Sequence, residues 1–419
     1  MNYVLGLKCI QCGQELEAKK GLYTCPACGS QAGIMDVIYD YKAIKRDFRR
    51  EELSANQERS IFRYMPFLPI QPDSKRPHLR IGWTPMYKPE GLAASLGMSN
   101  LYIKDDGQNP TASLKDRASV IAVVKAAEEE MTTIACSSTG NAASSLAGSA
   151  AAMGMTTFIF VPSRAPQGKV AQLLIFGANV ISVQGNYADA FKLSAAAIDR
   201  WGWYNRNAAI NPYLVEGKKT VALEIAEQLN WEVPDWVVLS VGDGCTIAGV
   251  WKGFKDLYQV GWIDKLPRLL GVQSTGCSPL TDAFLNNRPW QPAEENTIAD
   301  SIAVGVPRNP EKALAAIRES SGTMVAVSDE EILEAMRFLG RTSGIFGEPA
   351  GVTGLAGLIK LVNQGKISPD DRVVSIVTGN GLKDVKNAIA AAGKPIKVEP
   401  TMEQLVEELN TRKLLKDFN

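Results

Sequence analysis

A lysine near the predicted start of a helix is the residue of this chain best suited to carbonyl chemistry. Lys115 closes the run Asn109-Pro110-Thr111-Ala112-Ser113-Leu114-Lys115. The Asn109-Pro110 pair predicts a turn and Ser113 predicts a helix cap, so Lys115 falls in the first helical turn. Backbone donors and the helix dipole favour anions there, which suits an amine that must hold a phosphate-bearing aldehyde. The alternative is a solvated surface group, since the chain has 45 lysines and arginines.

A glycine-rich stretch later in the chain is a candidate phosphate site. The apolar run Trp236 to Val241 is followed by Gly242, Asp243, Gly244, Cys245 and Thr246. Closely spaced glycines let the backbone wrap an anion, and the Thr246 hydroxyl is a further donor. A dinucleotide fingerprint needs a different glycine spacing and an acidic residue on the next strand. We therefore expect this loop to bind one phosphate.

Two further polar turns follow apolar runs. The turn Ser137-Ser138-Thr139-Gly140-Asn141 precedes an alanine- and serine-rich helix expected from Ala142 to Met153. The turn Thr378-Gly379-Asn380-Gly381 follows the run Arg372 to Val377. Such turns are common in α/β proteins, so each by itself is a weak indication of a ligand site.

The elements that must position these residues are short apolar runs alternating with alanine-rich helical runs from about Trp83 onward. This alternation predicts an α/β fold with a parallel sheet wrapped by helices. The expected strands are Thr132 to Cys136, Thr157 to Val161, Asn179 to Val183, Trp236 to Val241, Leu269 to Val272 and Arg372 to Val377. Ligands gather at the carboxyl ends of such strands, where the three polar turns lie.

Four of the seven cysteines form two closely spaced pairs near the N-terminus. The pairs are Cys9 with Cys12 and Cys25 with Cys28, and a glycine follows each pair. Two such thiolate pairs can hold one tetrahedral zinc ion. A closed four-cysteine site leaves no position for substrate, so it would stabilise a zinc-ribbon-like element over residues 1–35. The alternatives are disulfides or metal-free thiols. Cys136, Cys245 and Cys277 are expected to be packed residues.

Composition excludes several classes of function. Positive and negative side chains balance at 45 each, which predicts no nucleic-acid partner and no membrane-surface partner. The segment Met1 to Leu7 lacks the apolar stretch of a signal peptide, so we expect a cytoplasmic protein. The one histidine, His78, removes histidine-based triads from consideration. Proton transfer is left to a lysine, a carboxylate, a hydroxyl or the substrate.

These segments together resemble a known enzyme family. The run ending at Lys115 resembles the Schiff-base lysine motif of pyridoxal-phosphate enzymes of the tryptophan-synthase β type, and most closely that of threonine synthases. The other three segments follow in the family's order, and the resemblance runs from Trp83 to Asp384 and into the cysteine pairs. It implies the two-domain fold type II. We expect a large cofactor-binding domain over 36–103 and 191–400, a small mobile domain over 104–190 and a C-terminal helix within 401–419.

The resemblance implies a role for each segment. Lys115 would hold pyridoxal 5'-phosphate as an imine, Asn141 would donate to its phenolic oxygen, and the loop 242–246 would hold its phosphate. The neutral hydroxyl of Thr378 would face the pyridine nitrogen, which favours elimination and replacement over transamination. The residues expected to contact the substrate are Ser138, Thr139, Gly140 and Asn207.

The implied activity is that of a carbon-oxygen lyase of threonine biosynthesis. O-phosphohomoserine and water would give threonine and phosphate by γ-elimination and β-replacement. Lys115 would move protons at Cα and Cβ, because a partly desolvated amine has a lowered pKa. The resemblance also implies a small-molecule amino-acid substrate and a homodimer.

The chain departs from the family pattern where the substrate phosphate is expected. Ala208 stands where a serine is usual, Leu214 where an arginine is usual, Ala142 where a threonine is usual and Asp243 where an asparagine is common. Each change removes a donor or adds negative charge. The candidates to compensate are Arg164, Lys169, Lys218 and Lys219. In the lysine motif, Ala112 and Leu114 replace glycine and phenylalanine.

Two other functions stay open at this point. One is a related pyridoxal-phosphate enzyme acting on a non-phosphorylated amino acid, such as a serine or threonine ammonia-lyase or a β-replacement enzyme. The run Thr297 to Ala303 resembles dehydratases as much as threonine synthases, whereas the residues after Asp384 are too few for a regulatory domain. The other is a zinc-ribbon interaction protein with a degenerate enzyme body, against which the intact Lys115 argues.

Overall fold

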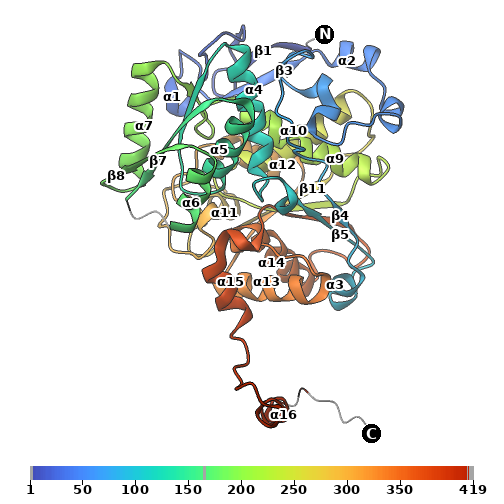
Figure 1. Cartoon of the computed structure of the whole chain (residues 1–419). Coiled ribbons are helices and arrows are strands. Elements are labelled where there is room, and N and C mark those ends of the chain that lie inside the picture. The colour runs from blue at the N-terminus through green and yellow to red at the C-terminus, as the bar shows by residue number, and fades with distance from the viewer. Residues whose placement is uncertain (1–2, 164–166, 413, 415–419) are drawn as a thin grey trace.

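The computed structural model describes residues 3–163, 167–412 and 414, and these residues form three sheets (Figure 1). The largest sheet has six strands in the order β12-β11-β10-β13-β5-β4. Neighbouring strands pair in parallel except β4, which is antiparallel to β5. The strands are β4 Met86–Tyr87, β5 Asn100–Asp105, β10 Trp236–Ser240, β11 Arg268–Ser274, β12 Thr323–Val327 and β13 Arg372–Val377.

Both faces of this sheet are buried, which explains why its strands are almost continuously apolar. Along β10, Val237 and Leu239 belong to one core, and Trp236 and Val238 belong to another. The first core includes residues of α9 Thr220–Gln228, α10 Cys245–Gln259 and α12 Pro310–Glu319. The second includes residues of α3 Glu90–Ser95, α13 Asp329–Ser343 and α14 Pro349–Asn363.

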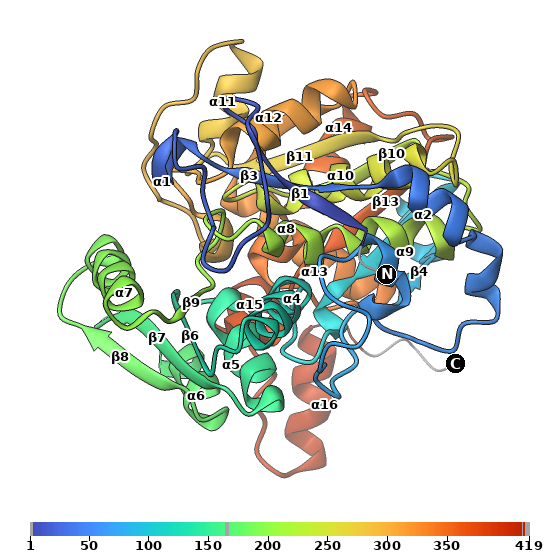
Figure 2. The ribbon, with the colours of Figure 1, turned by 90° about the horizontal axis from the view of Figure 1, so that it is seen from above.

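A second, parallel sheet has the order β8-β7-β6-β9. Its strands are β6 Thr133–Ser137, β7 Thr156–Pro162, β8 Asn179–Val183 and β9 Tyr204–Asn205. Its helices are α4 Lys115–Glu128, α5 Asn141–Met153, α6 Gln167–Ile175 and α7 Tyr187–Trp201. Residues of α4, α5, β6 and β7 share a separate core. In Figure 2, α6 and α7 lie with β7 and β8 at one side of the molecule.

The N-terminal segment forms a third sheet, which is antiparallel and has the order β2-β1-β3. Its elements are β1 Val4–Cys9, β2 Glu15–Leu16, α1 Gly29–Ala32 and β3 Met35–Tyr39. The buried residues Leu7 and Val37 of this sheet belong to the same core as α9 and α10. The N-terminal element therefore packs against the body of the protein.

The remaining elements connect these layers. The α-helices are α2 Tyr41–Asp47, α8 Tyr213–Lys218, α11 Pro279–Leu285, α15 Val385–Ala392 and α16 Met402–Thr411. The 3-10 helices are η1 Arg50–Ser54, η2 Ile61–Phe67, η3 Asp106–Gln108, η4 Asp300–Ile302 and η5 Gly381–Asp384. Helix α16 has no buried residue and lies away from the body in Figure 1.

The predicted α/β fold and all six predicted strands are present. The runs Asn179 to Val183 and Arg372 to Val377 match their strands residue for residue, and the other four overlap theirs. From Trp83 onward, the strands β4, β5, β9 and β12 were missed. Strand β5 ends in Lys104 and Asp105, which resemble a polar loop in the sequence but are buried in the structure.

The predicted cap of α4 is wrong. The helix does begin at Lys115, but its N-cap residue is Leu114, and no side chain caps it. The Ser113 hydroxyl is buried without a hydrogen-bond partner among the described residues. The Ser113 backbone instead bridges to Gly379, and the next amide, that of Leu114, donates to the Thr378 carbonyl at 2.9 Å. This pairing with the loop after β13 holds the segment in place of a cap.

The boundaries of the six-stranded and four-stranded sheets do not coincide with the expected domain boundaries. Residues 100–105 belong to the six-stranded sheet, and the four-stranded sheet extends to Asn205. The division at residues 104 and 190 stays a prediction. Helix α16 lies within the expected C-terminal segment, of which residues 413 and 415–419 lie outside the described residues.

Candidate active site

One cavity of about 780 Å³ brings the sequence-predicted residues together. It lies where the carboxyl ends of β6, β10 and β13 meet the turns that follow them. Its lining includes every residue predicted to bind cofactor or substrate: Lys115, Ser138, Thr139, Gly140, Asn141, Asn207, Gly242, Asp243, Gly244, Cys245, Thr246 and Thr378. Segments far apart in the sequence therefore form one site.

Lys115 is held in this cavity by the first turn of α4. Its side chain is partly exposed to the cavity and otherwise surrounded by protein. Burial, together with the neighbouring ammonium of Lys218, lowers the pKa of Lys115 to about 8. A substantial fraction of this amine is therefore neutral near neutral pH, as a nucleophile or a base requires.

Asn141 begins α5 and has a partner that the sequence did not suggest. Its side-chain nitrogen donates to the Glu348 carboxylate at 2.6 Å. Glu348 is 3% exposed, and its burial raises the pKa of the carboxyl group against the opposing effect of Asn141. In the sequence, Glu348 precedes Pro349 and resembles an ordinary helix cap. Its side chain makes no cap hydrogen bond, however, and contacts Asn141 instead.

Two glycines of the loop 242–246 leave no room for a side chain, because other backbone packs against them. Gly244 has φ 87°, and a Cβ atom there would lie 2.7 Å from the Asn309 carbonyl oxygen. A Cβ atom on Gly242 would lie 3.0 Å from Ile302 Cα. Helix α10 begins at Cys245 without a side-chain cap, so its first amides have no acceptor within the helix. The Asp243 carboxylate accepts from the Arg308 amide at 3.2 Å.

Asn207 lines the cavity, and only its side-chain oxygen has a hydrogen-bond partner among the described residues. Its side-chain oxygen accepts from the Ser137 amide at 2.9 Å, which ties it to the end of β6. Its side-chain nitrogen is buried and has no hydrogen-bond partner among the described residues. Ala142 and Ala208, which replace donors in the family pattern, also line the cavity.

Three of the four cations that could compensate lie in the described part of the chain, in different places. Lys218 lines the cavity, whereas Lys219 pairs with Glu216 and Asp256 outside its lining. Lys169 pairs with Asp300, and Arg164 lies outside the described residues. Leu214 is 1% exposed and packs in the core of the four-stranded sheet.

The sequence did not suggest Arg206, which is buried and lines the same cavity. It also did not suggest the contact of the Arg308 guanidinium with the Phe191 ring, at 3.8 Å from the ring centroid. Both Arg308 and Phe191 line the cavity.

Comparison with known proteins identifies the family of this arrangement. Residues 78–379 match the model of the pyridoxal-phosphate dependent enzymes. The chain belongs to this family. The threonine synthase of Methanocaldococcus jannaschii is 42% identical over 95% of this chain and 98% of its own length. That of Methanosarcina acetivorans is 41% identical over 96% of this chain and 98% of its own length. The resemblance to threonine synthases is confirmed.

Solved structures of other pyridoxal-phosphate enzymes share the fold. Threonine deaminase isoform 2 from Solanum lycopersicum has a TM-score of 0.63 at 22% identity, covering 74% of this chain and 87% of its own. Diaminopropionate ammonia lyase from Escherichia coli has a TM-score of 0.64 at 19% identity, covering 93% of this chain and 98% of its own. The predicted fold class is thereby confirmed. Within the described residues, no helix is long and apolar enough to cross a membrane.

The residues of this pyridoxal-phosphate enzyme fit the cofactor of its family. Three features lie in one cavity: an amine with a lowered pKa, a glycine loop without room for a Cβ atom, here called the cradle, and the uncapped start of α10. The amine can hold the aldehyde, and the cradle with the helix start can hold the phosphate. Thr378 and Asn141 line the same space and offer a hydroxyl and an amide for the ring.

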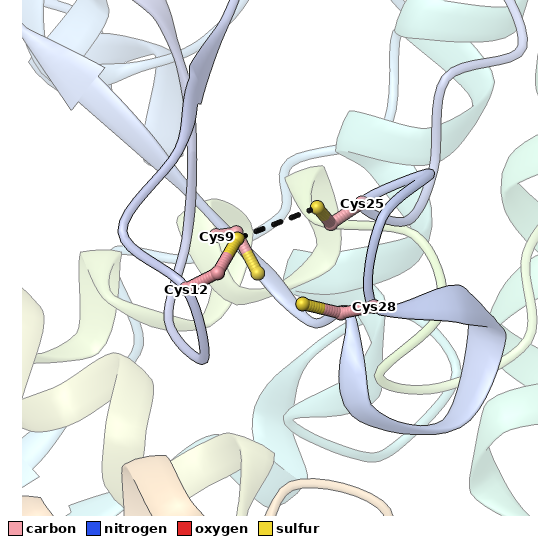
Figure 3. A group of neighbouring side chains, drawn as sticks. All are labelled: Cys9, Cys12, Cys25 and Cys28. Carbon is pink, nitrogen blue, oxygen red and sulfur yellow. Dashed lines mark hydrogen bonds between the residues drawn. The ribbon is translucent and has the colours of Figure 1, made fainter.

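The four N-terminal cysteines converge on one point (Figure 3). Their sulfur atoms all lie within 4.8 Å of one another, and the Cys12 and Cys25 sulfurs are 3.8 Å apart. A tetrahedral zinc ion with Zn–S bonds of about 2.3 Å requires sulfur atoms about 3.8 Å apart. All four are free thiols, and the glycines after the pairs, Gly13 and Gly29, both have φ 74°. The cluster is compatible with a metal-binding element. The three other cysteines are buried, as expected.

Proposed function

We propose that this enzyme is a threonine synthase, which converts O-phosphohomoserine and water to threonine and phosphate. The observation that carries the proposal is the 42% identity with a threonine synthase over 95% of the chain. The cavity supports it, because the predicted cofactor and substrate residues line one space.

We assign the cofactor contacts to residues of this cavity. Lys115 would hold the aldehyde, and the amides of 242–246 with the Thr246 hydroxyl would hold the phosphate. Asn141 has a second N–H besides the one given to Glu348, and that N–H would serve the phenolic oxygen. Thr378 would face the ring nitrogen as a neutral partner. Bound pyridoxal phosphate acts as an electron sink that makes protons on the amino-acid carbons acidic.

Lys115 is the proposed base and acid of the reaction. The Lys115 amine would take a proton from Cα and then one from Cβ of the substrate, and it would later return protons at Cγ and Cα. Its lowered pKa suits both directions, because efficient proton transfer needs a group whose pKa lies near the working pH. Loss of phosphate from Cγ and addition of water at Cβ would then complete the conversion to threonine.

The substrate carboxylate would bind the turn before α5. Ser138, Thr139 and Gly140 line the cavity at the start of this helix, where amides and the helix dipole favour an anion. Asn207 would contribute its remaining side-chain donor. Closure of the small domain over the cofactor would exclude water from the pocket.

A pair of assays tests this function. Purified enzyme should release phosphate from O-phosphohomoserine and form threonine in equal amount. It should form little 2-oxo acid from serine or threonine. Release of 2-oxo acid without any release of phosphate would overturn the proposal in favour of an ammonia-lyase.

We also propose that the four N-terminal cysteines bind a structural zinc ion. The sulfur spacing supports a tetrahedral site, and the element packs on the main core. Metal analysis of the purified protein should find about one zinc per chain, and Cys12→Ser should lower this content. A homodimer and a cytoplasmic location remain proposals that rest on the family resemblance and on the sequence. Light scattering would test the dimer.

A further inference from the structure

The cavity contains a buried lysine side chain that has no salt-bridge partner in the described part of the chain. Lys218, the last residue of α8, is 4% exposed and lines the cavity. Its side chain forms no hydrogen bond or salt bridge with any residue in the described part of the chain. Burying a charge without a counter-charge is costly, so such a group calls for an anionic ligand.

The next residue shows how this chain normally treats a buried lysine. The Lys219 ammonium is fully buried, lies 2.6 Å from the Glu216 carboxylate and also pairs with Asp256. The two adjacent lysines therefore have different electrostatic surroundings. The carboxylates of Glu216 and Asp256 neutralise Lys219, whereas Lys218 lines the cavity.

A second buried cation lies in the same cavity. Arg206 is 2% exposed, and its Nε and Nη2 atoms donate to Ser119 Oγ at 3.1 and 3.0 Å. These bonds orient the guanidinium, which lines the cavity. Arg206 and Lys218 interact repulsively, and an anion bound near both would relieve the repulsion.

The glycine loop already offers donors for one phosphate. Its amides lie at the start of α10, and a Cβ atom on Gly249 of that helix would lie 3.1 Å from Lys218 Cβ. Helices α8 and α10 therefore approach closely, so the Lys218 side chain enters the cavity beside the loop. A cofactor and a phosphorylated substrate together bring two phosphates, and the loop accounts for one of them.

We propose that Lys218, together with Arg206, binds the phosphate group of the substrate. This inference rests on the proposed function, because it assigns the part of the site that a phosphorylated amino acid needs and an unphosphorylated one does not. Lys218 thus becomes the residue that selects a phosphorylated substrate. Its charge would be neutralised on binding, and phosphate release after the elimination would restore the unpaired state.

The test compares Lys218→Met with Lys218→Arg in the holoenzyme. The probes are inorganic phosphate and a phosphonate analogue of the substrate, each titrated while the absorption of the bound cofactor is followed. Lys218→Met should weaken the binding of the phosphonate by about 10- to 100-fold and raise KM more than it lowers kcat. Lys218→Arg should recover at least part of this loss. Binding of the unphosphorylated analogue 2-aminobutyrate should be unchanged in both variants.

The cofactor content of each variant separates the two phosphates. If Lys218→Met loses pyridoxal phosphate and, once reloaded, binds the phosphonate as the wild type does, Lys218 serves the cofactor and the inference is wrong. It is also wrong if both affinities are unchanged. If the wild type releases no phosphate from O-phosphohomoserine, the proposed function fails, whatever the variants do. If Lys218→Met folds poorly, Lys218→Gln, which also removes the charge, is tested in the same way, and unchanged phosphonate binding by that variant would contradict the inference.

Discussion

The first turn of α4 carries two cations with opposite surroundings. Arg117 is fully buried between two carboxylates, with Nε 2.6 Å from Asp106 and Nη2 2.8 Å from Glu224. Lys104 joins this network through Glu224 at 2.7 Å. Lys115, two residues earlier, lines the cavity, and its side chain forms no hydrogen bond or salt bridge with another described residue.

The contrast separates structural charge from functional charge. In the network that we call the Arg117 network, formed by Lys104, Asp106, Arg117 and Glu224, each charge has an opposite charge at hydrogen-bonding distance. In the cavity, Lys115 and Lys218 lack such partners within the described chain. Buried charges that the protein does not neutralise must be neutralised by deprotonation or by a ligand.

The largest effect is expected from Lys115→Ala. Loss of the amine should lower kcat for threonine formation by at least about 1000-fold, because both cofactor attachment and proton transfer depend on it. The visible absorption of the cofactor should also disappear. Since Lys115 has no structural ion pair, its unfolding free energy should stay near the wild-type value. A retained absorption band would show that another amine holds the cofactor.

The Arg117 network should respond in the opposite way. Glu224→Gln leaves Arg117 and Lys104 short of a counter-charge and should lower the unfolding free energy by about 3–5 kcal/mol. Denaturant unfolding measures this loss. The matched control is Glu232→Gln, which removes an exposed pair with Arg372 and should have little effect. Equal effects of the two substitutions would contradict the structural role.

Acid should weaken the same network. Burial raises the pKa of Glu224, but Arg117 and Lys104 outweigh burial and lower it to about 2. Because the folded pKa lies below the unfolded value, the carboxylate stabilises fully above pH of about 4.5, and this stabilisation is lost as the pH falls towards 2. The unfolding free energy of the wild type should therefore fall over this range more steeply than that of Glu224→Gln. Parallel pH profiles would refute the assignment.

The rate of cofactor binding should depend on pH, by about tenfold per pH unit below pH 8. Only the neutral Lys115 amine can attack the aldehyde, and its pKa lies at about 8. The rate at which cofactor-free enzyme binds pyridoxal phosphate should rise about tenfold per pH unit below pH 8 and level off above it. Stopped-flow absorption measures this rate. A midpoint near that of an ordinary lysine would mean that the cavity does not shift the amine.

The smallest effect concerns the turn before Lys115. Ala112 has φ 66°, a conformation that an alanine adopts with strain. Ala112→Gly should raise the unfolding free energy by less than about 1 kcal/mol, since relief of strain is partly offset by the greater freedom of glycine in the unfolded chain. Thermal unfolding can detect this change. A clear loss of stability would show that the alanine methyl group contributes packing.

The sequence allowed prediction of residues that follow strands. Asn141, the loop 242–246 and Thr378 were placed in one site because carboxyl ends of parallel strands meet at one edge, and Lys115 was placed there by the family resemblance. Glu348 was missed because an acidic residue before Pro349 resembles a helix cap. Its contact with Asn141 joins segments 207 residues apart. No local pattern contains such a contact.

The direction of side chains also could not be predicted from the sequence. Lys218 and Lys219 are indistinguishable in the sequence, and their roles differ because Asp256 of α10 lies against Lys219 and not against Lys218. Strand β5 was missed for a similar reason. Its Lys104 is polar in the sequence but fully buried, because Glu224 accepts its charge. In both cases a distant partner decides what the local residues do.

The most direct test of the separation compares unfolding free energies of Arg117→Met and Lys218→Met, measured by denaturant without added phosphate. Arg117→Met leaves two buried carboxylates without their partner and should lose about 3–5 kcal/mol. Lys218→Met removes a buried charge that has no partner in the described chain and should lose little or nothing. A loss for Lys218→Met as large as that for Arg117→Met would contradict the account.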